Sequence, residues 1–149
     1  MIETLESLAC VHGVRMVALI TPDGVPVAVP GADAGDRAGT GDVDAIAAVA
    51  TQWMDEVGRT LGALTWPAPE HLVVTAARGN LVLMRSPGSV LVALTDTTID
   101  QAELRLQMEG AAARIGRSLR SLGDRASLNR APAALPQPPA HEIDPSTQG

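Results

Sequence analysis

The order of hydrophobic patterns is the feature that most constrains how this chain can fold. Apolar residues recur at helical spacing from about Ile2 to Val11, in a long stretch that follows Asp42, and again after Asp96. Short apolar runs typical of strands lie between these stretches, two before the long one and three after it. We therefore expect a short helix, a hairpin, a long amphipathic helix, a three-stranded meander and a last helix, together an α/β domain.

The first two strand-like runs predict a hairpin with one strand covered on both faces and one edge strand. Residues Val14 to Thr21 are apolar at both alternating positions, which indicates cover on both sides. Pro22-Asp23-Gly24 has the composition of a tight turn, and Val25 to Val29 returns as the second strand. Pro26 cannot donate a hydrogen bond to a neighbouring strand, so this second strand should lie at a sheet edge.

The long helical stretch has an apolar stripe and a polar side. Pro30 to Gly41 holds four Gly and two Asp and is expected to be a flexible loop, after which Asp42 or Asp44 would cap the helix. Gly58 and Gly62 weaken a helix but permit close approach of another backbone. The apolar positions that step by three or four are Ile46, Ala50, Trp53, Met54, Val57, Leu61 and Leu64. The residues expected on the other side are Gln52, Asp55, Glu56 and Arg59.

Three apolar runs after the long helix predict an antiparallel meander. They span His71 to Ala77, Asn80 to Ser86 and Val90 to Thr95. Arg78-Gly79 and Pro87-Gly88-Ser89 separate these runs and have the composition of tight turns. Because such short connections join antiparallel neighbours, the three strands should lie next to one another in the sheet.

The last helical stretch is followed by a change of composition. Its charges complement the helix dipole, with acids at the start and arginines toward the end. These residues are Asp96, Asp100, Glu103, Arg114, Arg117 and Arg120. The expected core stripe is Leu104, Met108, Ala111, Ile115, Leu119 and Leu122. Five Pro lie between Pro132 and Pro145, so we expect residues 1–123 to form the domain and residues 124–149 a disordered tail.

Composition excludes several classes of function. A chain of 149 residues with 46% hydrophobic residues fits one domain, and its core must be aliphatic because it has no Phe or Tyr and two Trp. The formal net charge is -6 and the 11 basic residues are scattered arginines, which argues against nucleic-acid binding. With no Lys, the chain has neither a Walker-type phosphate loop nor a Schiff-base lysine, so Gly39-Thr40-Gly41 is interpreted as an ordinary loop.

Residues that carry chemistry are few and do not cluster along the sequence. Cys10 is the single cysteine, which excludes an internal disulfide, and its place in the first helix predicts a small buried hydrophobic residue. Surface or capping roles are expected for His12, His71 and His141. Turn or cap roles are expected for Asp23, Asp96 and Asp100. The sequence therefore predicts no enzyme activity, no cofactor and no metal site.

The first residues and the apolar runs bear on localisation. The segment Met-Ile-Glu-Thr-Leu-Glu is acidic where a signal peptide carries positive charge. No apolar run approaches the length needed to span a bilayer. We therefore expect a soluble cytoplasmic protein with no membrane insertion.

A resemblance to a known family rests on an ordered set of features rather than on one motif. These are the run from Gly13 to Gly24, the meander, and Thr98-Ile99 leading into Leu104-Arg105-Leu106. Together with the order of the elements they resemble the Roadblock / dynein light chain family, its bacterial members in particular, over about Met1 to Leu122. The chain departs from the family at Ala102, where glycine is common, and in the long loop before the second helix.

The resemblance implies a three-layer αβα fold and a dimer. A five-stranded antiparallel sheet would have the long helix on one face and the two terminal helices on the other. The long helix and the strand from His71 to Ala77 would form a homodimer, which removes an exposed apolar sheet edge. The residues assigned to that interface are Trp53, Gly58, Gly62, Leu72 and Val74.

The resemblance also implies a function, because members of the family regulate or scaffold small Ras-like GTPases. This chain would then be a GTPase activator or an effector-type scaffold without chemistry of its own. The surface assigned to the GTPase is Gln52, Asp55, Glu56 and Arg59. Arg59 is also a candidate arginine finger, although exposed helix arginines usually pair with a nearby acid.

Three alternatives stay open from the sequence. One is a profilin-like or longin-like assembly module that acts independently of nucleotide, and another is a small-ligand sensor domain. The third concerns the tail, where Pro136-Gln137-Pro138-Pro139 is a candidate extended ligand for a partner.

Overall fold

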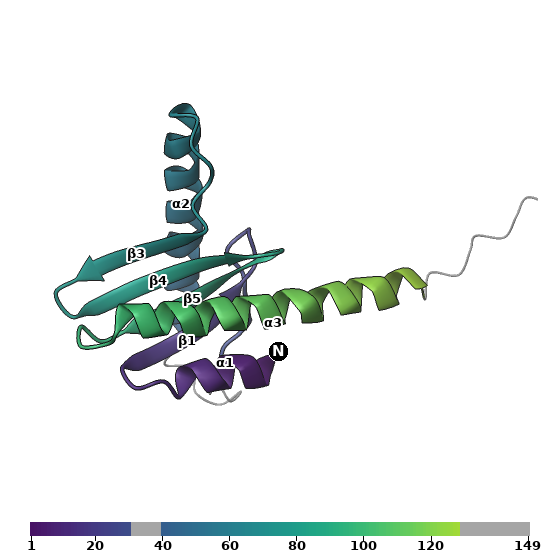
Figure 1. Ribbon diagram of the computed structural model, residues 1–149, viewed down its shortest axis with the longest axis horizontal. Coiled ribbons are helices and arrows are strands. Elements are labelled where there is room, and N and C mark those ends of the chain that lie inside the picture. Colours follow the sequence, from purple (N-terminus) through teal and green to yellow (C-terminus); the bar gives the residue numbers. More distant parts are fainter. Residues whose placement is uncertain (31–39, 129–149) are drawn as a thin grey trace, which may run out of the picture.

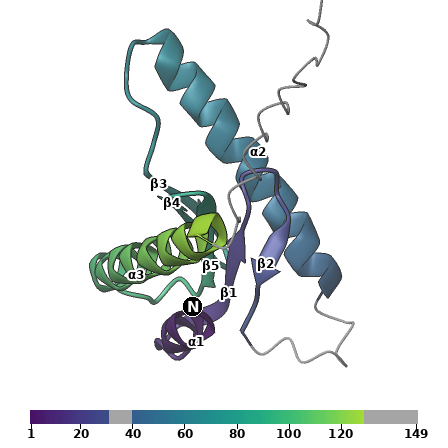
Figure 2. The same ribbon diagram turned by 90° about the vertical axis from the view of Figure 1, so that its right-hand side faces the viewer.

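The structure is a computed structural model that describes residues 1–30 and 40–128. Its helices and strands are α1 (Ile2–Ala9), β1 (Val14–Ile20), β2 (Pro26–Ala28), α2 (Thr40–Ala63), β3 (His71–Ala76), β4 (Gly79–Ser86), β5 (Ser89–Thr95) and α3 (Gln101–Leu128). The five strands form one antiparallel sheet in the order β2-β1-β5-β4-β3. Helix α2 lies on one face, and α1 and α3 lie on the other (Figures 1 and 2). The predicted three-layer αβα fold is confirmed.

Each face of the sheet has its own hydrophobic core, because successive side chains of a strand point to opposite faces. On the α3 side, the described core residues from strands are Val17, Leu19, Val82, Met84, Leu91 and Ala93, which pack with α1 and α3. On the α2 side they are Ala18, Ile20, Leu83, Val90 and Val92, which pack with α2. The first strand is therefore apolar at both alternating positions because helices cover both faces of the sheet, as predicted.

The meander is confirmed, and a glycine is required next to its first turn and within its second. Strand β4 begins at Gly79, so the first turn is Ala77-Arg78 rather than Arg78-Gly79. A Cβ on Gly79 would lie 2.1 Å from the carbonyl oxygen of Thr95, so no larger residue fits this close approach of two strands. Gly88, which follows Pro87 in the second turn, has φ +73°.

The two edges of the sheet differ. Strand β2 is short and pairs with β1 through Leu19 with Ala28 and Ile20 with Pro26, so the prediction of an edge strand that contains Pro26 is confirmed. At the other edge, β3 pairs with β4 along its whole length and has no second strand partner among residues 1–30 and 40–128. The row of backbone groups on the outer side of β3 is therefore open to pairing.

The helix ends correct several predictions. Helix α1 ends at Ala9, and Cys10, expected to be buried, is exposed, because it follows the buried Leu8 by two residues and so lies about 200° around the helix from it. Helix α2 already begins at Thr40, so Asp42 lies in its first turn and neither Asp42 nor Asp44 precedes the helix as a cap. The loop predicted before α2 lies, for residues 31–39, outside the described part of the chain.

Helix α3 begins as predicted and ends later than predicted. The Asp100 carboxylate accepts hydrogen bonds from the backbone N–H groups of Ala102 (2.8 Å) and Glu103 (3.2 Å) and so caps the helix. The helix continues to Leu128, so residues 124–128, expected in the tail, are helical. Leu122, expected in the core stripe, is 56% exposed because the helix has run past the sheet by this point (Figure 1). The rest of the predicted tail, residues 129–149, lies outside the described residues.

Candidate interaction surface

Helix α2 covers the sheet with its first half and runs past the sheet edge with its second half (Figure 1). Val43, Ala47, Ala50 and Met54 are buried against the sheet. The apolar residues of the later turns are less covered, since Val57 and Leu61 are half-buried, and Leu64, just past the helix end, is 57% exposed. The apolar stripe predicted for this helix therefore extends beyond the core that one copy of the chain provides.

The end of α2 is shaped by a residue with unusual backbone geometry. Thr65 has φ +61°, in the left-handed region that glycine usually supplies after a helix. The N–H of Thr65 donates to the carbonyl of Gly62, and the N–H of Trp66 donates to that of Leu61, both at 3.0 Å. This turn sends the chain back toward the sheet and leaves Trp66 62% exposed.

Strand β3 carries further apolar residues on the α2 side of the sheet. Leu72 and Val74 pair with Leu83 and Leu81, and these positions face the α2 side of the sheet. Both side chains are half-buried, and they lie on the strand whose outer edge is open. We define the overhang surface as the apolar residues of this region, Leu61, Leu64, Trp66, Leu72 and Val74.

The other residues predicted for a dimer interface lie on α2 itself. Trp53 is 39% exposed and lies one turn before Val57. A Cβ on Gly58 would have Pro69 as its nearest neighbour, at 3.8 Å, and one on Gly62 would meet nothing within 4 Å among the described residues. The two glycines are thus not required by packing within the chain as the structure describes it.

The residues predicted for partner binding share the solvent side of α2. Gln52, Asp55, Glu56 and Arg59 are all exposed, on consecutive turns of one helix. Glu56 and Arg59 form an ion pair between neighbouring turns. Arg59 is therefore held by an acid of its own helix, which is the arrangement that exposed helix arginines usually have. A cavity of about 270 Å³ adjoins Asp55, between α2 and the hairpin turns that contain Pro22 and Pro87.

A polar groove lies on the opposite face, between β3 and α3. Its deeper part is a cavity of about 310 Å³ lined by His71, Arg105 and Glu109, and a more open hollow of about 570 Å³ continues it past Val73. Arg105 and Glu109 are paired at 2.8 Å. The Nε2 atom of His71 is buried and has no hydrogen-bond partner among the described residues. Burial lowers the pKa of His71, Arg105 lowers it further and Glu109 opposes the shift.

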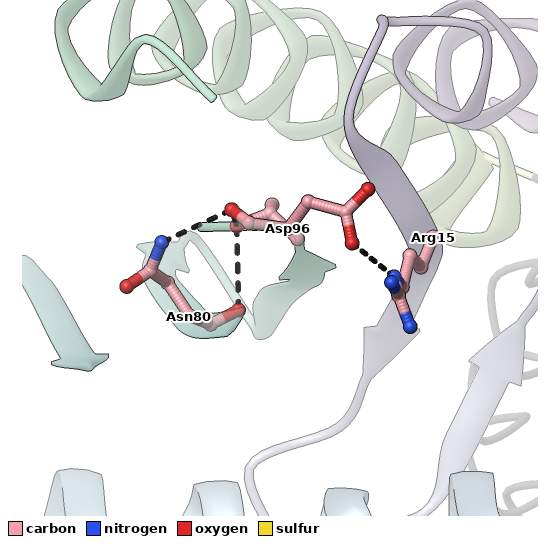
Figure 3. Close-up of polar contacts among 4 residues, drawn as sticks. Arg15, Asn80 and Asp96 are labelled. Carbon is pink, nitrogen blue, oxygen red and sulfur yellow. Dashed lines mark hydrogen bonds and ion pairs between the residues drawn. The ribbon is translucent and has the colours of Figure 1, made fainter. Parts of the chain in front are cut away.

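A third polar cluster is structural. Arg15 on β1 forms an ion pair with the carboxylate of Asp96, which sequence patterns placed at the start of the last helix (Figure 3). The Asp96 backbone N–H donates to the carbonyl of Gly13 (2.7 Å), and its carbonyl accepts from Asn80 Nδ2 (3.3 Å). Asp96 thus ties together the ends of three strands, a role that no short-range pattern indicates.

The remaining candidate residues are scattered. His12 is exposed, and His141 lies outside the described residues. Within residues 1–30 and 40–128, no three or more His, Cys, Asp or Glu side chains gather as a metal site would require. The fully exposed Asp23 is a turn residue, and a hydrogen bond from the Thr21 side chain lowers its pKa. None of the helices in the described part of the chain combines the length and the hydropathy of a membrane span.

Comparisons with known proteins are informative at the level of the fold. No protein-family model matches the chain, and no curated protein matches its sequence. Myxococcus xanthus MglB aligns with a TM-score of 0.70 at 15% identity, over 80% of this chain and 94% of that one. A Roadblock/LC7 domain from Streptomyces avermitilis aligns with a TM-score of 0.69 at 21% identity, over 80% and 98%. An MglB structure with a tetrameric arrangement aligns with a TM-score of 0.67 at 21% identity, over 77% and 84%.

Proposed function

We propose that this chain, which has the Roadblock/LC7 fold, is a non-catalytic homodimeric regulator or scaffold of a small Ras-like GTPase in the cytoplasm. The observation that carries the proposal is the overhang surface beside the open edge of β3. An apolar surface next to an unpaired strand calls for a partner, because both features are costly to leave in water. The resemblance to a family that regulates Ras-like GTPases supports the class of partner.

The geometry of α2 and β3 supports a homodimer as part of this proposal. A second copy related by a two-fold axis would pair its β3 with this one and bring its own α2 across the overhang surface. Trp53, Leu72 and Val74 would then lose their remaining exposure, and Gly58 and Gly62 would let the two helices approach closely. The tetrameric arrangement of one MglB structure supports self-association as a property of proteins with this fold.

The partner surface follows from the dimer. If two copies of α2 lie side by side, Gln52, Asp55, Glu56 and Arg59 of both copies form one continuous polar platform. Its acids would attract a basic region of the GTPase. In this proposal the platform acts by binding and holding the partner, and Arg59, which pairs with Glu56 on the same helix, is part of that binding surface.

A pull-down from native extract tests the partner. Tagged protein would be incubated with GDP in one arm and with a non-hydrolysable GTP analogue in the other, and bound proteins would be identified by mass spectrometry. We expect a small GTPase to be enriched with the analogue, and Asp55→Arg plus Glu56→Arg to abolish this enrichment while the dimer persists. Recovery of the same proteins in both arms, with no GTPase among them, would contradict the proposal and favour a nucleotide-independent assembly module.

A further inference from the structure

The polar groove between β3 and α3 has the features of a small-molecule site, and the proposed function does not use it. It lies on the α3 side of the sheet, whereas the overhang surface lies on the α2 side (Figures 1 and 2). Its deeper cavity, of about 310 Å³, is at the lower end of the range for small-molecule sites, about 300–1,000 Å³. Such sites combine apolar walls with a few polar groups that fix the orientation of the ligand.

Arg105 provides a place for an anion in this groove. It borders both the deep cavity and the open hollow of about 570 Å³, and it is the only charged residue among the described ones that line the hollow. Its Nε atom donates to Glu109 Oε1 (2.8 Å), while its terminal nitrogens have no acceptor among the described residues. Two such nitrogens can donate in parallel to one carboxylate. Thr75 and Gln101 add hydroxyl and amide donors beside them.

Glu109 provides a place for a cation one helical turn further along α3. Its Oε1 atom accepts from Arg105, and its Oε2 atom accepts no hydrogen bond from the part of the chain that the structure describes. The Arg105 and Glu109 side chains are 61% and 47% exposed, so a ligand can reach both. The groove therefore presents a positive and a negative group side by side, each with hydrogen-bonding capacity left over.

His71 faces this ion pair from β3. Its buried Nε2 atom has no hydrogen-bond partner within residues 1–30 and 40–128, although buried polar atoms nearly always have one. Burial lowers the pKa of His71, so its ring is uncharged at neutral pH and does not repel a cation bound at Glu109. The polar part of the groove is thus incomplete in hydrogen bonding without adding a charge that would oppose a ligand.

The remainder of the deep cavity is apolar. Small side chains on α3 leave space there, and an alkyl group that enters this space leaves water. We define the apolar wall as the residues that line this part, Met84, Pro87, Ala112 and Ala113.

Two further charged residues border the deep cavity, but their side chains belong to the other face. The Arg85 backbone N–H donates to the carbonyl of Glu70 (2.8 Å) beside the cavity. Arg85 pairs with Val90, which packs on the α2 side, and Glu70 precedes His71, which faces α3. Because side chains alternate along a strand, both charges are directed toward the α2 side. Arg105 and Glu109 therefore set the charge pattern of the groove.

We propose that the groove binds a free amino acid with an apolar side chain. The ligand carboxylate pairs with the terminal nitrogens of Arg105, its ammonium group pairs with Glu109 Oε2, and its side chain packs on the apolar wall. The two charges of an amino acid are neighbours, as are those of the Arg105–Glu109 pair, so one ligand satisfies both. The site belongs to one copy of the chain and does not rest on the proposed function.

The test is a titration of the full chain followed by the backbone amide signals in two-dimensional NMR. The probe is L-leucine, and two matched analogues each lack one charge: 4-methylpentanoate has no ammonium group and 3-methylbutylamine has no carboxylate. Leucine should give saturable shifts at Ala102, Arg105 and Ala113, with a dissociation constant of about 1 mM or below. Each analogue should bind at least about tenfold more weakly, because it leaves one partner of the ion pair unmatched.

Substitutions of exposed residues separate the three contacts. Arg105→Gln and Glu109→Gln should each weaken leucine binding about tenfold or more, since each removes one charge from the site. Ala113→Leu fills space beside the apolar wall and should have a similar effect. Arg114→Gln is the matched control, because this exposed arginine lies on the side of α3 away from the groove and should leave binding unchanged.

Three results would overturn the proposal. One is the absence of saturable shifts with leucine up to about 10 mM. Another is binding of 4-methylpentanoate as tight as that of leucine, which would mean that the groove takes a simple carboxylate. The third is leucine binding that Arg105→Gln and Glu109→Gln leave unchanged, which would place the ligand elsewhere. None of these results bears on the proposed function, which the nucleotide-dependent pull-down tests separately.

Discussion

Helices α2 and α3 lie on opposite faces of the sheet and both run past it, yet their projecting ends differ in chemistry (Figures 1 and 2). The projecting end of α2 is followed by the exposed Leu64 and Trp66, whereas the projecting end of α3 combines the exposed Leu122 and Leu128 with Arg117, Arg120 and Arg125. Burial of apolar surface is a strong, salt-insensitive source of association, and exposed ion pairs are a weak one. Similar helical overhangs should therefore support interfaces of very different strength.

The largest expected effect is on the overhang surface. Val74→Arg places a charge on the α2 side of the open strand, where it would be desolvated in the dimer, and should weaken dimerisation by about 4 kcal/mol, or roughly a thousandfold. Val73→Arg is the matched control, because Val73 is the next residue of the same strand, 38% exposed, and faces the α3 side. Sedimentation equilibrium measures both. If the two variants weaken dimerisation equally, the strength of the dimer does not depend on which face of β3 carries the new charge.

The second effect compares how much the buried part of α2 and its projecting end contribute to the stability of one chain. Met54 is 1% exposed and Leu64 is 57% exposed. In the monomeric Val74→Arg background, Met54→Ala should lower the free energy of unfolding by about 3 kcal/mol, because it leaves a cavity, and Leu64→Ala by less than about 0.5 kcal/mol. Urea denaturation measures both. A large loss for Leu64→Ala would show that the end of α2 is already covered within one copy.

The fold is predictable from the sequence because its evidence is spread over many residues. The apolar residues at both alternating positions of β1 and the edge position predicted from Pro26 each reflect the environment of a whole strand. The prediction for Cys10 was wrong because this residue lies off the side of α1 that Leu5 and Leu8 bury. The prediction for Leu122 was wrong because helical spacing shows the apolar side of a helix but not where its packing partner ends. The same limit hid the overhang of α2.

The candidate site is predictable only in part. Spacing along one helix correctly placed Gln52, Asp55, Glu56 and Arg59 in solvent on the polar side of α2. The partner of Asp96 is Arg15, 81 residues away, and the groove around His71 combines a strand edge with a distant helix. No local pattern encodes such contacts, since they arise from the order in which the strands assemble.

The third effect depends on pH and compares the half-buried His71 with the exposed His12. The pKa of His71 is lowered mainly by burial, so the folded state prefers the neutral imidazole. Below pH 6.5, the ordinary value, the unfolded chain binds more protons than the folded one, and stability should fall with pH until His71 also protonates in the folded state. His71→Gln should flatten this part of the stability profile, measured by urea denaturation. His12→Gln, which changes an exposed histidine, should leave the profile as it is.

The smallest effect lies at the end of α2, where Thr65 holds φ +61°. A β-branched residue there is strained by about 1 kcal/mol, which Thr65→Gly relieves, while the greater freedom of glycine in the unfolded chain offsets part of the gain. The expected net change is a stabilisation of up to about 0.5 kcal/mol in thermal unfolding. Thr60→Gly, at an exposed position inside the same helix, should destabilise by about 1 kcal/mol. If both variants lose stability equally, the turn between Leu64 and Trp66 does not depend on a left-handed residue.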